Sequence, residues 1–223
     1  MPLANIVVET FLKGGPIMWP ILACLVVALA TVTERVLYWR KVRRLRADLV
    51  FAEALGDVRL GRFGPVWERT RDATSPFLVA LRAGLANGRA EPVTAMQLSA
   101  EETLEEAGAR QWLLSTIVTL APLLGLLGTV IGIMGSFQFI GSEQLAVAKV
   151  SGGVGEALIA TAAGLGIAIV CLIPHNYFHR RVQALRHDLE QAVNQAEVAL
   201  KAAAAAGQPV GEFQPETAAG RAR

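Results

Sequence analysis

The sequence predicts an all-α integral membrane protein with three transmembrane helices. Of its 223 residues, 53% are hydrophobic and only 18% are charged, whereas about a quarter of the residues of a soluble domain are charged. The apolar residues gather in three long runs, residues 14–33, 111–142 and 150–174, and only Glu156 places a charge inside one of them. Because a helix of about 20 residues crosses the hydrocarbon core of a bilayer, each run is long enough to span it.

The N-terminal part is expected to comprise a segment outside the membrane, residues 1–13, and a first transmembrane helix, residues 14–36. A cleaved signal peptide is the alternative, since Ala28-Leu29-Ala30 imitates a cleavage site. However, Glu9 and Lys13 leave the preceding segment without net positive charge, and the basic cluster follows the apolar run instead of preceding it. This order favours a retained membrane anchor.

The distribution of basic residues predicts the orientation. Six of them directly follow the first run: Arg35, Arg40, Lys41, Arg43, Arg44 and Arg46. Arg180 and Arg181 follow the third run, whereas only Lys13 and Lys149 lie on the opposite side. The positive-inside rule therefore places the N-terminus outside and the C-terminus in the cytoplasm.

The remaining elements follow from these three spans. Residues 37–110 are expected to form a cytoplasmic helical region with breaks at 61–65, 75–76 and 87–88, whose last helix continues without a breaker into the second span. The segments expected after it are a second span at 111–140, a short periplasmic loop at 141–150, a third span at 151–174, a cytoplasmic helix at 175–200 and a disordered tail at 201–223. The short loop makes the second and third spans an antiparallel hairpin.

Small residues recur at helical spacing in this hairpin. Gly125, Gly128, Gly132 and Gly135 follow one another in the second span, and Ala157, Thr161, Gly164 and Ala168 do so in the third. Lipid provides no hydrophobic drive for helix association, so close packing of small residues must supply it. The two stripes predict either a mutual seam or a surface for a partner's helix.

Glu156 is a candidate ion-pathway residue because a carboxylate in or near hydrocarbon is costly. Thr129 and Thr161 lie on or beside the small-residue stripes, and Thr161 follows Glu156 by about 7.5 Å of helical rise. The alternatives are an interfacial glutamate exposed to water and threonines that bond to their own helix or to a neighbour.

Other chemistry is weakly indicated. His175 and His179 have a spacing that could bind a metal, but without a third ligand we expect a basic turn that faces lipid headgroups, and neither a metal nor a cofactor. No G-x-S-x-G motif, aspartate pair within the spans or phosphate-binding loop is present, so we do not expect an enzyme.

Two stretches resemble a known family. Residues 121–134, APLLGLLGTVIGIM, and residues 156–165, EALIATAAGL, are similar to the second- and third-span signatures of the MotA/TolQ/ExbB proton-channel family. The opening GGPIMWP at residues 14–20 and the Glu34-Arg35 pair also resemble ExbB-type members. Three spans fit the ExbB/TolQ branch better than the four-span flagellar stators.

The resemblance implies a bacterial inner-membrane homo-oligomer, commonly a pentamer, that encloses a single-span partner of the ExbD/TolR type. In that family the titrating aspartate belongs to the partner, the threonines matching Thr129 and Thr161 line its surroundings, and the glutamate matching Glu156 belongs to the polar pathway. Proton flow then energises a TonB- or TolA-like process such as outer-membrane transport. A structural scaffold without ion conduction and a motility-type stator are the alternatives.

Overall fold

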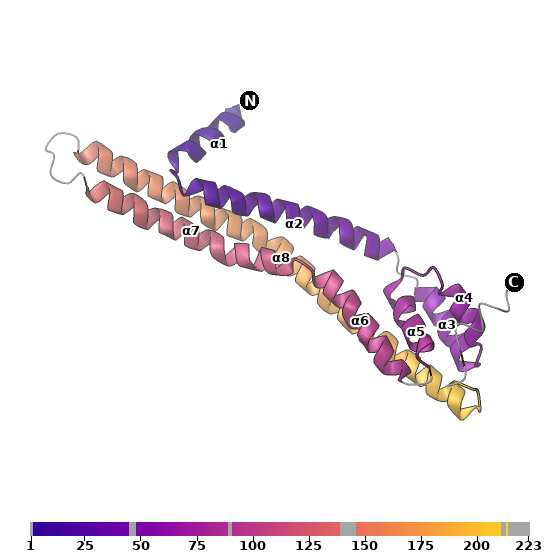
Figure 1. The fold of residues 1–223 in the computed structure, drawn as a ribbon. Helices are drawn as coiled ribbons and strands as arrows, with labels where there is room; N and C mark the ends of the chain where they lie inside the picture. Colours follow the sequence, from indigo (N-terminus) through magenta and orange to yellow (C-terminus); the bar gives the residue numbers. More distant parts are fainter. Residues whose placement is uncertain (1, 45–47, 89–90, 139–145, 211–212, 214–223) are drawn as a thin grey trace. The chain divides into compact units, whose positions relative to one another are not determined.

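The computed structural model describes residues 2–44, 48–88, 91–138, 146–210 and 213. Eight α-helices and no strand occur among these residues (Figure 1). The helices are α1 (Pro2–Lys13), α2 (Met18–Arg44), α3 (Asp48–Arg59), α4 (Phe63–Arg69), α5 (Pro76–Ala86), α6 (Pro92–Gly108), α7 (Gln111–Phe137) and α8 (Ala146–Ala205). The predicted all-α class is therefore confirmed.

Three stretches of helix are long and apolar enough to cross a membrane, as predicted. They are Met18–Val42 in α2, Pro92–Phe137 over α6 and α7, and Val150–Ala205 in α8. The loop expected at 141–150 falls largely on residues 139–145, which lie outside the described residues. The predicted boundaries of the spans, of the cytoplasmic segments and of the outer loop therefore stay predictions.

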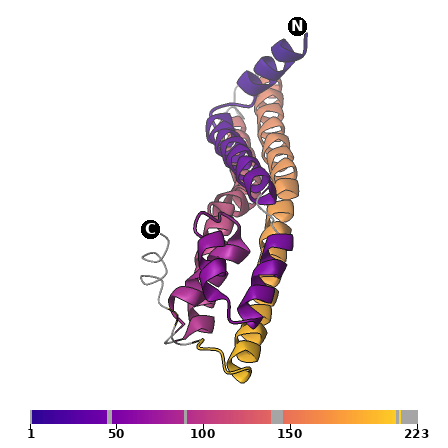
Figure 2. The same cartoon turned by 90° about the vertical axis from the view of Figure 1, so that its right-hand side faces the viewer.

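The chain divides into two compact units. Residues 1–35 and 110–179 form the first, here named the membrane unit, and residues 36–109 and 180–223 form the second, the peripheral unit. In the membrane unit, α7 and the first half of α8 run side by side (Figures 1 and 2). The start of α2 joins them through Met18 and Ile21, which pack with Ala160 of α8.

The peripheral unit has a core of large side chains from α3 to α6 and from the second half of α8. Leu185, Leu189, Val193 and Leu200, whose spacing indicates a helix, are all buried in it. On α8 they follow one another at steps of four, four and seven residues, which places them on one face. A helix with one such apolar face is stabilised by packing that face against its neighbours.

The C-terminal end of α8 differs from the expected disordered tail. The helix continues to Ala205 because residues 202–206 are all alanine, the best helix former. It then ends at Gly207, whose φ is +74°, with bonds from Gly207 N to Ala204 O and from Gln208 N to Ala203 O, both 3.0 Å. This pair of bonds is a Schellman motif.

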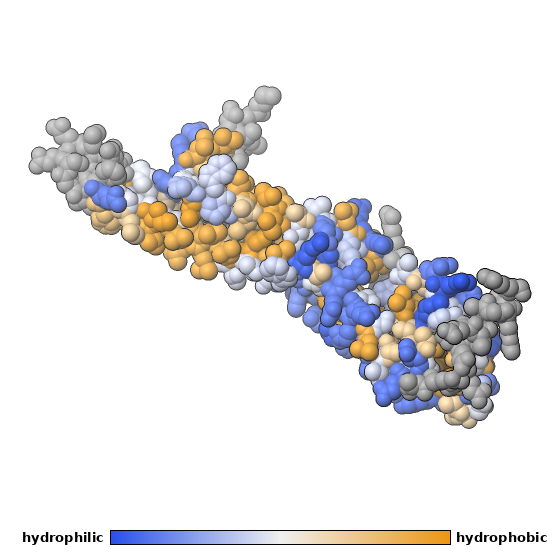
Figure 3. Space-filling view, viewed as in Figure 1, coloured by the Kyte–Doolittle hydropathy of each residue, from blue (hydrophilic) through white to orange (hydrophobic). Residues whose placement is uncertain are grey.

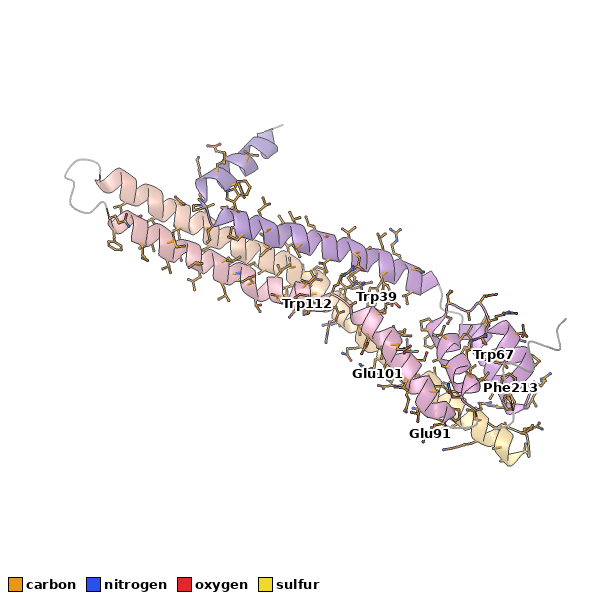
Figure 4. All side chains as sticks on the ribbon, in the orientation of Figure 1. Trp39, Trp67, Glu91, Glu101, Trp112 and Phe213 are labelled. Carbon is orange, nitrogen blue, oxygen red and sulfur yellow. The ribbon has the colours of Figure 1, made fainter. Side chains whose placement is uncertain are left out.

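Beyond this cap, Phe213 lies against the aromatic rings of α4. Its ring centroid lies 6.1 Å from that of Phe63 and 6.0 Å from that of Trp67 (Figure 4). Arg82 stacks its guanidinium on Trp67, 3.7 Å from the ring centroid. Part of the segment 201–223 is thus packed, while residues 211–212 and 214–223 lie outside the described residues.

The expectation of an unbroken helix from Val93 into the second span is wrong. Helix α6 ends at Gly108, and α7 begins at Gln111. Between them Arg110 adopts a left-handed conformation with φ +62°, which interrupts the helical hydrogen bonds. Gly108, the last residue of α6, is the one turn residue beside this break, and the sequence analysis did not use it.

Candidate functional site

Helices α7 and α8 approach each other through their small residues. A Cβ atom on Gly125 would lie 2.9 Å from the Cα of Thr161, and one on Gly132 would lie 2.9 Å from the Cβ of Ala157. On Gly164, a Cβ would overlap the carbonyl oxygen of Ala121. The two backbones are therefore almost in contact along this seam, and any added side chain would force them apart.

Of the other predicted packing glycines, Gly128 lies in the seam and Gly135 does not. Gly128 faces Ala160 of α8 and the side chain of Ile17, which precedes α2. A Cβ on Gly135 would meet no atom within 4 Å, so this position offers open space. Further along, the buried Ser136 donates its hydroxyl to the carbonyl oxygen of Gly132 at 2.8 Å and lies against Gly153. Sequence reasoning missed Ser136.

The half-buried Thr161 links the two helices of the seam. Its hydroxyl donates a hydrogen bond to the carbonyl oxygen of Gly125 at 2.7 Å. The hydroxyl of Thr129, also half-buried, donates instead to the carbonyl oxygen of Leu126 in its own helix at 2.6 Å. Since a hydroxyl has one proton and two lone pairs, both threonine oxygens keep the capacity to accept a hydrogen bond.

Glu156 occupies a different face of α8. Its half-buried side chain lies against Gly15, in the turn between α1 and α2, where a Cβ would overlap the carboxyl group. Gly15 has a φ of +72°, so this position favours glycine for both conformation and space. Among the described residues the Glu156 carboxylate has no hydrogen-bond or salt-bridge partner.

The structure does not bring Glu156 and Thr161 together. At 3.6 residues per turn, five residues rotate the side chain by about 140°. Glu156 consequently faces the turn before α2, whereas Thr161 faces α7. Within one chain the carboxylate and the hydroxyl line two different contacts of the same helix.

The Glu34-Arg35 pair, to which the sequence alone assigned no role, lies at the other end of the first span. Arg35 is 3% exposed, and its Nε donates to Glu34 Oε2 at 3.0 Å. Nη1 of Arg110 lies 2.8 Å from Glu34 Oε1. Glu34 therefore binds two guanidinium groups, one from α2 and one from the turn before α7. The adjacency of Glu34 and Arg35 is the only signal in the sequence, because the pairing with Arg110 depends on packing.

His175 and His179 stack one turn apart on α8, with ring centroids 6.4 Å apart and an angle of 21° between the rings. Within the described part of the chain, no group of three histidine, cysteine, aspartate or glutamate side chains could hold a metal ion. Most of the membrane unit's surface seen in Figure 3 is apolar, with a few hydrophilic residues near the end drawn in grey and on α1.

Comparison with known proteins places this arrangement in a family. The sequence model described as the MotA/TolQ/ExbB proton channel family matches residues 74–191. A putative biopolymer transport protein ExbB-like 1 of Synechocystis is 35% identical over 175 residues, which cover 74% of this chain and 67% of the relative.

Two further relatives match a shorter part. The biopolymer transport protein ExbB of Neisseria gonorrhoeae is 42% identical over 88 residues, 39% of this chain and 40% of the relative. The Tol-Pal system protein TolQ of Haemophilus influenzae is 39% identical over 95 residues, 42% of each chain. With three apolar helices of spanning length, the chain is a multi-pass protein of the inner membrane. It belongs to the MotA/TolQ/ExbB proton channel family, in its ExbB/TolQ-like branch.

Proposed function

We propose that the chain is the ring-forming subunit of a proton-driven motor in the inner membrane. It forms a homo-oligomer, a pentamer, around a single-span partner of the ExbD/TolR type. Its N-terminus lies outside and its C-terminus in the cytoplasm. Proton flow moves the ring relative to the partner and energises a TonB- or TolA-like envelope process such as outer-membrane transport.

The observation that carries the proposal is the environment of Glu156. Its carboxyl group lies in a membrane-spanning helix, against the Gly15 turn, without an ion-pair partner among the described residues. An acidic side chain is rarely kept in such a place unless it serves ion or proton movement. A membrane potential supplies about 2.3 kcal/mol per charge and 100 mV, which is enough to bias a conformational step.

The two threonines support a role beside a partner's carboxyl group. Thr129 and Thr161 already donate their protons to the carbonyl oxygens of Leu126 and Gly125. Each oxygen is left as an acceptor, and an acceptor stabilises the protonated, donating form of a nearby carboxyl group. The pair would thus favour uptake of a proton by an acidic residue that enters from a partner helix.

Exposed apolar side chains on α7 and α8 leave room for assembly. Leu123 and Leu126 on α7 and Leu165 and Ile169 on α8 are each at least 47% exposed in the single chain. Such a surface in a membrane protein is covered by lipid or by other helices. Further copies of the chain and the partner helix would pack there without burying charge.

The experiment is a proton-flux measurement on liposomes that hold the complex purified from its source organism. We expect Thr161→Val to lower the flux under an imposed pH gradient by about tenfold, the equivalent of one lost hydrogen bond of about 1.4 kcal/mol. Glu156→Gln should lower it at least as much. Thr161→Ser keeps the hydroxyl and should restore most of the flux.

Matched controls are Thr116→Val and Glu9→Gln. The Thr116 hydroxyl bonds only within its own helix, to the carbonyl oxygen of Trp112, and Glu9 is an exposed partner of Lys13. Both variants should conduct like the wild type. Wild-type liposomes that conduct no more than empty ones would identify a scaffold and overturn the proposal.

A further inference from the structure

The register of the seam places a layer of polar side chains at one end of the membrane unit. Gly164 lies against Ala121. Three turns, about eleven residues, further along α8 lead to His175, and three turns back along the antiparallel α7 lead to Arg110 and Gln111. The 2.8 Å bond between Arg110 and Glu34 adds the end of α2 to the same level.

Two buried nitrogen atoms in this layer lack a partner. His175 Nδ1 and Gln111 Nε2 are both shielded from solvent, and neither has a hydrogen-bond partner among the described residues. More than nine in ten buried polar groups do have one, so two at the same level require a common explanation. A pocket that admits water to both would satisfy them, since a buried water joins two to four polar groups.

The distance of His175 from Glu156 along α8 is also informative. It follows Glu156 by nineteen residues, or about 28 Å along the helix, close to the thickness of the hydrocarbon core. It lies on the buried face of α8 that Gly164, Ala168 and Cys171 define, at steps of three and four residues. One turn beyond it, His179 is exposed and stacks on its ring.

We propose that His175 is the group through which protons leave the seam on the cytoplasmic side. This inference rests on the proposed function and adds an exit to it. His175 accepts a proton at Nδ1 from the interior and releases the proton held at Nε2 outward, past His179. The ring ends neutral with its two nitrogens exchanged, and rotation or the reverse exchange through water restores it. Imidazole suits this task because it gains and loses a proton between pH 5 and 8.

The charged groups that the register of the seam places on the level of His175 come from several segments of the membrane unit. Glu34 and Arg35 come from α2, Arg110 comes from the turn before α7, and His179 comes from α8 itself. The Glu34 carboxylate binds both guanidinium groups, so among the described residues this cluster has no unpaired carboxylate that could hold an imidazolium.

The test compares three histidine variants of α8 in liposomes that hold the purified complex. We expect His175→Gln to lower proton flux by at least about tenfold, the loss of one acid–base group. The dependence of flux on the pH of the cytoplasmic side between 5 and 8 should disappear with it. His179→Gln should have a smaller effect. His187→Gln is the matched control, because His187 is exposed and, among the described residues, bonds only to Gln191.

The possible results distinguish a failure of the His175 exit from a failure of the proposed motor function. If the wild type conducts and His175→Gln conducts equally with an unchanged pH profile, the exit is wrong while the proposed function stands. If the wild type does not conduct, the proposed function fails and the exit with it. Should His175→Gln fail to assemble, ¹⁵N NMR of the wild-type complex decides: the ring N–H protons of His175 must exchange with water. A ring whose nitrogens do not exchange overturns the exit.

Discussion

The two units of this chain differ in the side chains that make their closest contacts. In the peripheral unit, the fully buried positions include Leu81, Met96 and Leu189, and the aromatic rings of Phe51 and Phe77 lie 6.0 Å apart. In the membrane unit, the closest contacts between α7 and α8 are made by glycines and alanines, and many large side chains of these helices are exposed, although Leu114 and Phe178 are buried. Ile173, for example, is 71% exposed in the single chain.

The difference follows from the solvent. Water drives large apolar side chains together, so a unit that faces water gains most from burying leucine and phenylalanine. Lipid is as apolar as leucine itself, so a membrane unit gains from backbone proximity, dispersion and interhelical hydrogen bonds. The bond from Thr161 to Gly125 is one such contribution. The same chain is thus expected to respond oppositely to truncation and to enlargement in its two units.

Truncation should be most damaging in the peripheral unit. Leu189 is 0% exposed in its core, and Leu189→Ala should lower the free energy of unfolding of this unit by about 2–5 kcal/mol through lost burial and a cavity. The measurement is hydrogen exchange of the backbone amides of residues 36–109 in the full chain. Protection of these amides should fall together.

Leu98→Ala is the matched control for this change. Leu98 lies on α6 of the same unit and is 63% exposed, so the same atoms are removed without loss of burial. Its effect should stay within about 0.5 kcal/mol, as for other surface positions. Equal losses of protection in the two variants would show that the peripheral core is not organised around Leu189.

Enlargement should be most damaging in the seam. In Gly164→Ala the new methyl group meets the carbonyl oxygen of Ala121 and the Cα of Gly125, which are backbone atoms that cannot rotate away. The helices must separate, at a cost of about 1–3 kcal/mol, typical of overpacking. Thermal unfolding of the solubilised chain, followed by circular dichroism, would show the loss.

Gly166→Ala, two residues along the same helix, is the control that sharpens the comparison. A Cβ on Gly166 meets nothing within 4 Å. Because alanine is the better helix former by up to about 1 kcal/mol, this variant should be as stable as the wild type or slightly more so. A Gly164→Ala protein that also gains stability would mean that the seam is not closely packed.

Much of the difference between the two units could be predicted from the sequence, since it depends on patterns along single helices. Run length and charge predict three spans, and the three apolar helices confirm them. The spacing of the glycines predicts which face of α7 is small, although Gly135 lies beyond the contact. Even the separation of Glu156 from Thr161 follows from the 3.6-residue period, once the two neighbours of α8 are known.

What could not be predicted depends on contacts between elements. Nothing in the sequence indicates that Arg110 takes a positive φ, because the turn forms where its side chain can reach Glu34. That His175 and Gln111 lie at the same level follows from the register of the seam, which the contacts between α7 and α8, such as that of Gly164 with Ala121, supply. The helix up to Ala205 could have been predicted from its alanines, but a composition typical of disorder masked that signal.

The smallest expected effect concerns the turn at Arg110. Here the ion pair with Glu34 stabilises the fold, whereas the left-handed backbone conformation of Arg110 destabilises it. A non-glycine residue in the left-handed region costs about 1–2 kcal/mol, while the partly exposed pair with Glu34 contributes about 0–1 kcal/mol. Arg110→Ala loses the pair and keeps the strain, so it should be the less stable variant. Arg110→Gly also loses the pair but relieves the strain. Part of this gain in stability, about 0.4–1 kcal/mol, is lost again because glycine gives the unfolded chain more conformational freedom. Thermal unfolding should therefore rank Arg110→Gly above Arg110→Ala by less than about 1.5 kcal/mol, with the wild type close to the glycine variant.

Repeating both changes in a Glu34→Gln background isolates the contribution of the pair. If the alanine variant proved at least as stable as the glycine variant in this background too, the backbone at residue 110 would not be strained. That result would mean that residue 110 does not adopt the left-handed conformation in the membrane.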